Sequence, residues 1–514
     1  MMNHLKNITI IGLFFPLSVF AGANSEAGAS STRGSYISGL GYIIQPNEIR
    51  IDSYVSQVDY NYPLPDREPI NVITATDYKN DTVYIQIGLK AKKESFASLP
   101  PLNIAFVIDK SGSMADSDKM DWVKDSFRVF ADQIREQDFI SLVAFDTSAT
   151  VLIPSRRIRN YQDKQEFIRT VNSIQPGGGT NVYDGMSLGY AQVTANFNRE
   201  YINRVICLTD GEHNSGGKGK QDIINLADRY NNQNINISTI ALGASADIPL
   251  MIDTAIKGGG SSRFISDHAT MVKTFGSELD RLLVPVARML KMDLTLSNGV
   301  VLKETWGYEN RVSGNTIHYS LDTIHNGDYE TLLAEVQLNP LEPVSMLLGD
   351  FTLEYLDLFN VPHRQGPYTI VLEASAIRNN TVINDPRVKE SEGYIVLGRG
   401  LINLGKQARI INNMQREYNT LRNQRYNSPS LPQNQDGGLL SLNDNIQSPA
   451  ARLRNQIIRE ISNAILNIND LSVYLTDIRN TLGGDQYNNE LKLLNNYNVS
   501  FSASHDNYAA IQND

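Results

Sequence analysis

The chain has one cysteine, Cys207, among its 514 residues. A single cysteine cannot form a disulfide within the chain, so the fold has to be stable without covalent cross-links. Cys207 lies in the apolar run VICLTD. We interpret it as a small buried hydrophobic side chain and not as a reactive thiol.

The sequence also lacks several residue combinations that catalysis commonly needs. The seven histidines are scattered, no H-E-x-x-H motif occurs, and no lysine follows Ser111 or Ser113 at the S-x-x-K spacing. Asp109 is followed two residues later by Ser111, where an aspartate-dependent phosphatase would have a second aspartate. The loop GGGT at 177–180 is not followed by the lysine of a phosphate-binding loop. We therefore expect that the protein is not an enzyme.

Basic residues are also fewer than acidic residues. Lys and Arg number 46 against 56 Asp and Glu, which gives a net charge of −10. This balance argues against nucleic acid as a partner. Hydrophobic residues make up 41% of the chain and charged residues 20%, values typical of globular protein, and the length allows several domains.

A long apolar run occurs only near the N-terminus. A lysine at position 6 precedes NITIIGLFFPLSVF, and the small residues AGA follow. This pattern predicts a signal peptide over residues 1–23 and export to the periplasm, the cell surface or the medium. No cysteine follows the run, so a lipid anchor is unsupported. We expect no transmembrane segment after cleavage, because no later run reaches the roughly 20 apolar residues that a span needs.

Changes of pattern along the chain predict its domains. We expect a β-rich segment over 24–99, an α/β domain over 100–287, a β-sandwich domain over 288–376, a helical region over 384–482 with a polar linker at 426–447, and a weakly ordered tail over 483–514. Because β-rich sequence flanks the α/β block on both sides, we predict one β-sandwich into which the α/β domain is inserted.

Inside the α/β block, strands alternate with helices. Residues 102–108 form a continuous apolar run, and residues 120–134 carry apolar side chains at spacings of three and four. Such alternation predicts a parallel sheet covered on both faces. Near the C-terminus, Ser448 and Pro449 begin a long helix with an apolar stripe. We expect it to pack on 384–426, with an intermolecular coiled coil as the alternative.

Polar residues gather at three places in this predicted α/β domain. Asp109, Ser111 and Ser113 follow the first strand, Thr180 lies in a glycine-rich loop before a helix, and Asp210 follows the strand that carries Cys207. Ligands of parallel sheets bind at the carboxyl ends of the strands. Asp109, Ser111 and Ser113 alone would suit a turn that caps the next helix. With Thr180 and Asp210 added, the set favours a metal site.

All five side chains offer hard oxygen donors. Such donors suit Mg²⁺, with Mn²⁺ or Ca²⁺ as alternatives, and do not suit zinc. If the two aspartates act through water, the cation stays short of negative ligands and favours an incoming carboxylate.

In this order on an α/β chain, DKSGSM, GGGTN and LTDG resemble a von Willebrand factor A (VWA) domain over roughly residues 100–285. In that family a D-x-S-x-S motif, a threonine and an aspartate form the metal-ion-dependent adhesion site. The resemblance implies direct coordination by Ser111 and Ser113, and by Thr180 when a ligand is bound. It implies that Asp109 and Asp210 act through water.

Two further similarities concern architecture. The stretch IRIDSYVSQVDYNYPLP before the domain is similar to bacterial secreted proteins of this type, and the β-domain with an inserted A domain is similar to inter-alpha-trypsin inhibitor heavy chains. The family also implies that occupancy of the site can shift the last helix of the domain, here about 268–284.

We therefore expect an exported, metal-dependent protein-binding module of the adhesion type, which binds an Asp or Glu of a protein partner. The alternative is an envelope assembly scaffold, self-associated through the C-terminal helices, in which the metal is only structural. Beside the site, Glu212 and His213 are either ligand contacts or solvated loop residues. Lys218 and Lys220 lie in an exposed loop that could attract an acidic partner.

Overall fold

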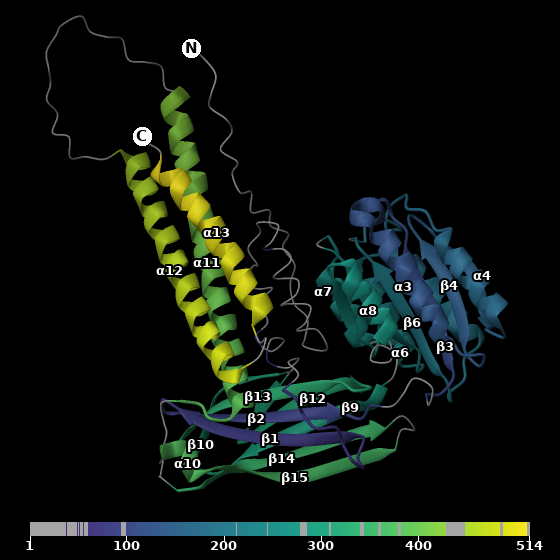
Figure 1. Cartoon of the computed structure of the whole chain (residues 1–514), viewed down its shortest axis with the longest axis horizontal. Helices are drawn as coiled ribbons and strands as arrows, with labels where there is room; N and C mark the ends of the chain where they lie inside the picture. The colour runs from purple at the N-terminus through teal and green to yellow at the C-terminus, as the bar shows by residue number, and fades with distance from the viewer. Residues whose placement is uncertain are drawn as a thin grey trace, which may run out of the picture. The chain divides into compact units, whose positions relative to one another are not determined.

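A computed structural model gives the fold of the chain (Figure 1). Apart from isolated positions before residue 60, it describes residues 60–93, 99–211, 213–243, 245–277, 285–307, 310–339, 344–357, 361–378, 382–427, 448–483 and 487–510. The chain divides into two compact units. One contains the α/β domain and the β-sandwich, and the other contains the C-terminal helices. The predicted signal peptide lies outside the described residues.

The α/β domain is built on a six-stranded sheet with the order β5-β4-β3-β6-β7-β8. Its strands are β3 (Leu102–Asp109), β4 (Phe139–Phe145), β5 (Ala149–Arg157), β6 (Ile202–Thr209), β7 (Asn236–Leu242) and β8 (Ser262–Ile265). The central strand β3 is buried along its whole length, as its apolar run predicts. All neighbouring pairs are parallel except β4 and β5. The expectation of a parallel sheet misses β5, because the short connection after Phe145 forms a hairpin and leaves no room for a crossover helix.

Helices cover both faces of this sheet. They are α3 (Lys119–Gln133), α4 (Tyr161–Asn172), α5 (Val182–Ala195), α6 (Lys220–Asn231), α7 (Ile248–Lys257) and α8 (His268–Ser277). Phe106 on β3 packs in an aromatic cluster with Phe127 and Phe130 of α3 and Phe275 of α8. These rings hold one helical layer against the sheet. The predicted helix at 268–284 is described only as far as Ser277.

The opposite face of β3 carries α5 at close range. A Cβ atom on Gly189 would lie 2.5 Å from Cγ2 of Val107. The glycine therefore lets the helix axis approach the strand. Val107 alternates with Phe106 along β3, so one strand organises both layers.

Two antiparallel sheets form the β-sandwich. One has the order β1-β2-β13-β10, from β1 (Ile70–Lys79), β2 (Thr82–Ala91), β13 (Tyr329–Leu338) and β10 (Val300–Trp306). The other has the order β11-β12-β9-β14-β15, from β11 (Asn310–Ser313), β12 (Thr316–His325), β9 (Pro285–Leu296), β14 (Met346–Asp357) and β15 (Pro362–Leu372). Strand β2 precedes the α/β domain in the sequence and β13 follows it, and the two strands pair within one sheet. The predicted fold class, an α/β domain inserted in a β-sandwich and followed by helices, is confirmed.

The C-terminal unit consists, in its described part, of α12 (Pro449–Leu482), α13 (Asn488–Ala509) and most of α11 (Pro386–Asn427). The hydroxyl of Ser448 accepts from the backbone N–H of Ala451 and begins α12. A Cβ on Gly400 of α11 would lie 2.5 Å from Leu471 of α12, and Tyr418 meets Tyr508 of α13 with ring centroids 5.6 Å apart. The expectation of a weakly ordered tail is wrong for residues 488–509. Buried Leu493, Leu494 and Tyr497 give α13 an apolar face that its many asparagines obscure.

Helix α10 (Ala374–Arg378) follows β15. Within the described residues, the helices that the chain forms are too short or too polar to cross a membrane.

We predict that Gly189→Ala destabilises the protein, although alanine normally raises helix stability by about 1 kcal/mol. The added methyl group overlaps Val107, and overpacking of this kind costs about 1–3 kcal/mol. Urea unfolding measures the change. In a Val107→Ala background the same substitution should cost much less; an equal cost in both backgrounds would show that the Val107 contact is not the cause.

We also predict that acid weakens the fold through His325, which is buried on β12. Burial lowers the pKa of His325, Asp328 opposes this effect, and Arg204 and Arg263 add to it. In the unfolded chain this histidine gains its proton below its ordinary pKa of about 6.5, but the folded state resists the charge. Stability is therefore full above that pH and is lost as the pH falls toward the lowered pKa.

Thermal unfolding between pH 7 and pH 5 measures this loss, which should be smaller in His325→Gln. The control is His363→Gln, which replaces a more exposed histidine on β15 of the same sheet. Equal acid sensitivity of His325→Gln and wild type would contradict the prediction.

Candidate functional site

Asp109 ends strand β3 and is fully buried. Its carboxylate accepts a hydrogen bond from the backbone N–H of Ser111 at 2.7 Å and another from Oγ1 of Thr209 at 2.5 Å. Burial raises the pKa of Asp109 to about 6, and these hydrogen bonds limit the rise. Both oxygens are thus directed to protein groups, and the contact with Thr209 joins the ends of β3 and β6.

Ser111 and Ser113 follow at the start of a 3₁₀ turn over Gly112–Asp118. Their hydroxyl oxygens lie 3.2 Å apart, and the Ser113 hydroxyl donates to Oδ1 of Asp210 at 2.8 Å. The predicted pair of hydroxyls and the second carboxylate therefore lie together at the carboxyl edge of the sheet.

The loop that carries Thr180 is bound to the loop after β3. The backbone N–H of Gly177 donates to the carbonyl of Lys110 at 2.7 Å, and that of Gly112 donates to the carbonyl of Gly178 at 3.2 Å. Gly178 has φ of +84°, a conformation that favours glycine. The glycines of GGGT thus form a backbone contact between loops, which is consistent with their position beside the site.

Thr180 itself is buried and is held by the loop after β6. Its N–H donates to Oδ1 of Asn214 at 2.9 Å, and its carbonyl accepts from the N–H of Asn214 at 3.0 Å. Gly211 makes room beside it. A Cβ there would lie 3.3 Å from Oγ1 of Thr180 and 3.8 Å from Oγ of Ser113, so both hydroxyls face the space that Gly211 leaves open.

Asp210 follows β6 and is fully buried. Its second oxygen, Oδ2, accepts from the ammonium nitrogen of Lys119 at 2.6 Å. Sequence reasoning missed Lys119, which lies outside the D-x-S-x-S motif as the first residue of α3. No motif spacing predicts this contact, because it depends on where α3 begins relative to the loop after β6.

The five predicted residues, Asp109, Ser111, Ser113, Thr180 and Asp210, all lie at this edge, which we call the rim. Among the described residues no group of three or more His, Cys, Asp or Glu is placed to hold a metal. The rim offers a different donor set, two carboxylates with three hydroxyls, which suits Mg²⁺. The space over Gly211, which the hydroxyls of Thr180 and Ser113 face, leaves room for such an occupant, while the ammonium of Lys119 already balances part of the negative charge at Asp210.

Comparisons with known proteins identify the family of the α/β domain. Residues 103–281 match the family model described as von Willebrand factor type A domain. The chain contains a VWA domain. Domains of this family commonly mediate metal-dependent protein interactions, and the recognition made from the motifs is confirmed.

Two known proteins are similar to this chain in sequence. YfbK of Escherichia coli (strain K12) is 25% identical over 317 residues, which are 58% of this chain and 54% of YfbK. Inter-alpha-trypsin inhibitor heavy chain H4 of Homo sapiens is 27% identical over 188 residues, which are 35% of this chain and 20% of that protein. The chain thus spans about half the length of YfbK and a fifth of the heavy chain.

Among solved structures, a von Willebrand factor type A protein from Catenulispora acidiphila is similar to this chain. It is 18% identical, and the alignment covers 68% of this chain and 84% of that one with a TM-score of 0.47.

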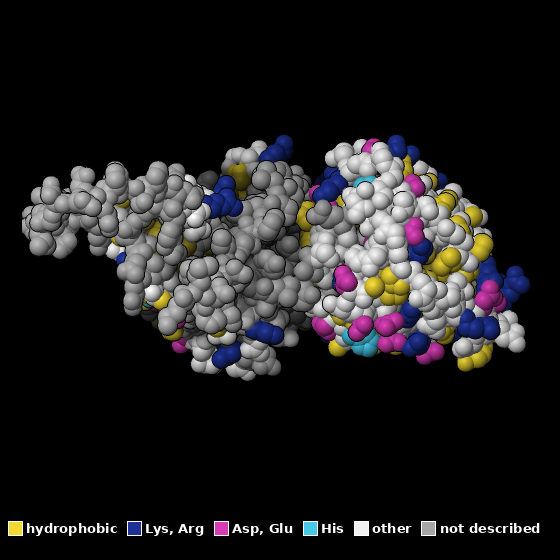
Figure 2. Space-filling model, turned by 90° about the horizontal axis from the view of Figure 1, so that it is seen from above, with side chains coloured by type: hydrophobic (Ala, Val, Ile, Leu, Met, Phe, Trp, Pro, Cys, Tyr) yellow, Lys and Arg dark blue, Asp and Glu magenta, His cyan; other side chains and the backbone are white. Residues whose placement is uncertain are grey.

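Around the rim of the VWA domain, several lysines have partners. Lys110 contacts Asp146, and Lys220 lies 2.6 Å from Asp247. Lys218 lies over the ring of Tyr183 with its nitrogen 5.6 Å from the ring centroid. Figure 2 shows basic and acidic side chains interspersed over the described surface in that view.

Glu212 and His213 are the two loop residues predicted to lie beside Asp210. His213 accepts from the backbone N–H of Val182 at 3.2 Å and contacts the carbonyl of Lys218 at 2.6 Å, so it joins its own loop to the start of α5. Glu212 lies outside the described residues.

The pentapeptide G-x-S-x-G, in which many hydrolases carry a catalytic serine, occurs at residues 185–189. Its serine lies inside helix α5, and its glycines pack against Val107 of β3. A catalytic serine of this motif needs a sharp turn between a strand and a helix. Here the two glycines serve helix packing.

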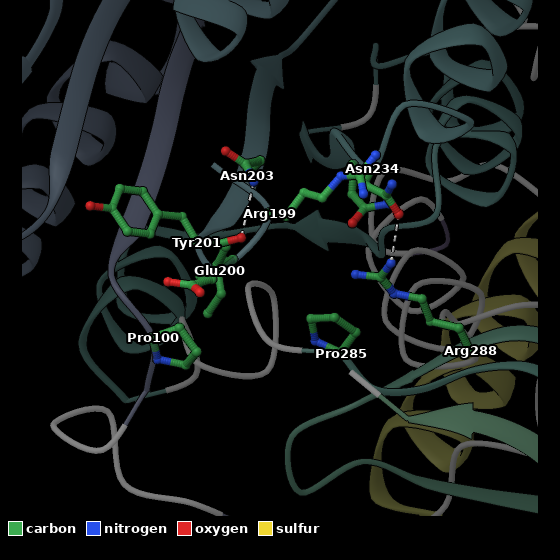
Figure 3. Close-up of a pocket in the computed structure, with 10 residues that line it drawn as sticks. Pro100, Arg199, Glu200, Tyr201, Asn203, Asn234, Pro285 and Arg288 are labelled. Carbon is green, nitrogen blue, oxygen red and sulfur yellow. Dashed lines mark hydrogen bonds between the residues drawn. The ribbon is translucent and has the colours of Figure 1, made fainter. Parts of the chain in front are cut away.

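A hollow elsewhere in this unit is lined by Pro100, Tyr201, Pro285 and Arg288, among others (Figure 3). Arg288 donates to Oδ1 of Asn234 at 3.2 Å. The hollow lies near the amino ends of β3 and β6, roughly 25 Å from the rim along an eight-residue strand. Its lining lacks the group of hydroxyls that the rim provides.

We predict that Asp109→Asn stabilises the metal-free protein. Asparagine can accept from Ser111 and contact Thr209 without a buried charge, and the raised pKa of about 6 shows that this charge opposes folding at pH 7. The expected gain is about 3 kcal/mol, since the pKa rises from 3.8 to about 6 and one pKa unit corresponds to about 1.4 kcal/mol.

Urea unfolding in the presence of a chelator measures this gain. The control is Asp121→Asn, which replaces an exposed aspartate on α3 and should change little. A less stable Asp109→Asn variant would show instead that the charged carboxylate supports the fold.

Proposed function

We propose that the protein is an exported protein-binding module that holds Mg²⁺ at the rim of its VWA domain and binds an aspartate or glutamate of a protein partner. Mn²⁺ and Ca²⁺ are the alternative cations. Export to the periplasm, the cell surface or the medium is part of the proposal and rests on the N-terminal sequence pattern.

One observation supports the proposal most directly. Two buried carboxylates and three hydroxyls from three separate loops meet at one edge of the sheet. Burying two carboxylates side by side opposes folding unless positive charge balances them. A fold that keeps both carboxylates at its rim is therefore suited to binding a cation.

The hydrogen bonds also suggest how the donors divide their roles. Both oxygens of Asp109 accept from Ser111 and Thr209, so this residue is suited to act through water. The hydroxyls of Ser111, Ser113 and Thr180 are neutral, so a cation that they held would keep its attraction for an outside carboxylate. That cation would supply an electrostatic anchor for an acidic side chain.

The alternative is an assembly scaffold that associates through the C-terminal helices. Leu466 and Val473 are exposed two turns apart on α12, and Val499 is exposed on α13. This pattern is compatible with contacts between chains, but it does not explain the arrangement of the rim.

Calorimetric titration of Mg²⁺, Mn²⁺ and Ca²⁺ into the purified protein tests the proposal. We expect binding that is lost in Asp109→Ala, because a buried carboxylate of the rim is removed, and weakened in Thr180→Ala, because the rim loses one hydroxyl. The control is Thr170→Ala, which removes an exposed hydroxyl on α4 and should bind as wild type does. A protein that binds none of the three cations would contradict the proposal.

Partner capture by the immobilised protein then separates the two functions. Capture through the rim should be lost in chelator and restored by Mg²⁺. Association that survives chelator, and disappears when the C-terminal helices are deleted, would favour the scaffold.

A further inference from the structure

We propose that Lys119 is an internal counter-charge of the rim, which weakens cation binding to the free protein and strengthens the binding of a carboxylate to the occupied site. This inference rests on the proposed function and assigns a specific part of it to a residue outside the known motif.

The contacts of Lys119 place its ammonium group within the donor set. Its nitrogen lies 2.6 Å from Oδ2 of Asp210 and 3.4 Å from the carbonyl oxygen of Ser113. The other oxygen of Asp210 accepts from the Ser113 hydroxyl. Lys119 is 7% exposed and Asp210 is fully buried, so water screens this pair only weakly.

The surrounding backbone is shaped for this side chain. Gly243, in the loop after β7, has φ of +73°, and a Cβ there would lie 3.1 Å from Cε of Lys119 and 3.7 Å from its nitrogen. Loops after β3, β6 and β7 therefore enclose the ammonium together. A close fit around a charged group indicates that the position is built for lysine.

Helix chemistry does not account for the residue. Lys119 is the first residue of α3, where the partial positive charge of the helix end disfavours a cation. The long side chain instead reaches back across the rim to Asp210. Its position is thus explained by the site and not by the helix.

The charges of the rim give the consequence. Asp109 and Asp210 together balance a divalent cation, so the ammonium of Lys119 leaves one positive charge in excess. A carboxylate from a partner restores neutrality. Without Lys119 the occupied rim would already be neutral, and the carboxylate would add an unbalanced negative charge.

Lys119→Met tests this account, because methionine keeps a long unbranched side chain and removes the charge. We expect the variant to bind Mn²⁺ about tenfold more tightly than wild type, since repulsion of the cation by a buried charge is lost. The matched control is Lys124→Met on the same helix, whose ion pair with exposed Asp121 spans 3.8 Å. It should leave the affinity within about twofold, as a surface pair contributes little.

A second titration measures how much a carboxylate strengthens the binding of Mn²⁺. Sodium acetate, compared with sodium chloride at equal ionic strength, should tighten Mn²⁺ binding to wild type more than to Lys119→Met. Lys119→Gln serves as a second neutral variant should the methionine variant fail to fold, and thermal melts in Mn²⁺ verify folding.

The outcomes separate this inference from the proposed function. Wild type that binds Mn²⁺, with folded neutral variants that bind equally or more weakly, would overturn the role of Lys119 and leave the metal site standing. Wild type that binds nothing, with neutral variants that bind, would support Lys119 as the excluding charge and overturn the proposed function. If neither binds while both fold, both ideas fail.

Discussion

The rim depends on one buried hydrogen bond, from Oγ1 of Thr209 to the carboxylate of Asp109. It connects the last residues of β3 and β6, the two central neighbours of the sheet. Once these strand ends are joined, the loops that follow bring Ser113 to Asp210. The third loop is added through two backbone hydrogen bonds, from Gly177 to Lys110 and from Gly112 to Gly178. Side chains that are far apart in sequence thus share one edge because the sheet holds their strands in register.

Charge explains why this edge differs from an ordinary helix-capping turn. A turn would leave Asp109 solvated, whereas here burial raises its pKa to about 6, and Asp210 is also fully buried. Such a pair is unfavourable for an isolated fold and becomes favourable when positive charge balances it. Lys119 supplies part of that balance from within the protein, and a divalent cation at the hydroxyls would leave one positive charge for the carboxylate of a partner. Strain of this kind is typical of sites selected for binding over stability.

Much of this arrangement could be predicted from the sequence. The apolar run of β3 and the helical stripe after it indicate an α/β sheet, and the carboxyl-edge rule brings Asp109 and Asp210 together. The family motif adds Thr180. Other features depend on tertiary contacts that no local pattern reports. Lys119 reaches Asp210 only because α3 begins beside Gly243. The antiparallel β5 follows from a short hairpin, and the apolar face of α13 is obscured by asparagine.

The most direct test of the account is the position of a bound cation in crystals grown with Mn²⁺, found by its anomalous scattering. The account predicts one strong peak at the rim, about 2.2 Å from the hydroxyl oxygens of Ser111 and Ser113, a distance suited to a hard cation on oxygen donors. A protein that binds Mn²⁺ in solution but shows its peak elsewhere, with the rim empty, would contradict the central claim.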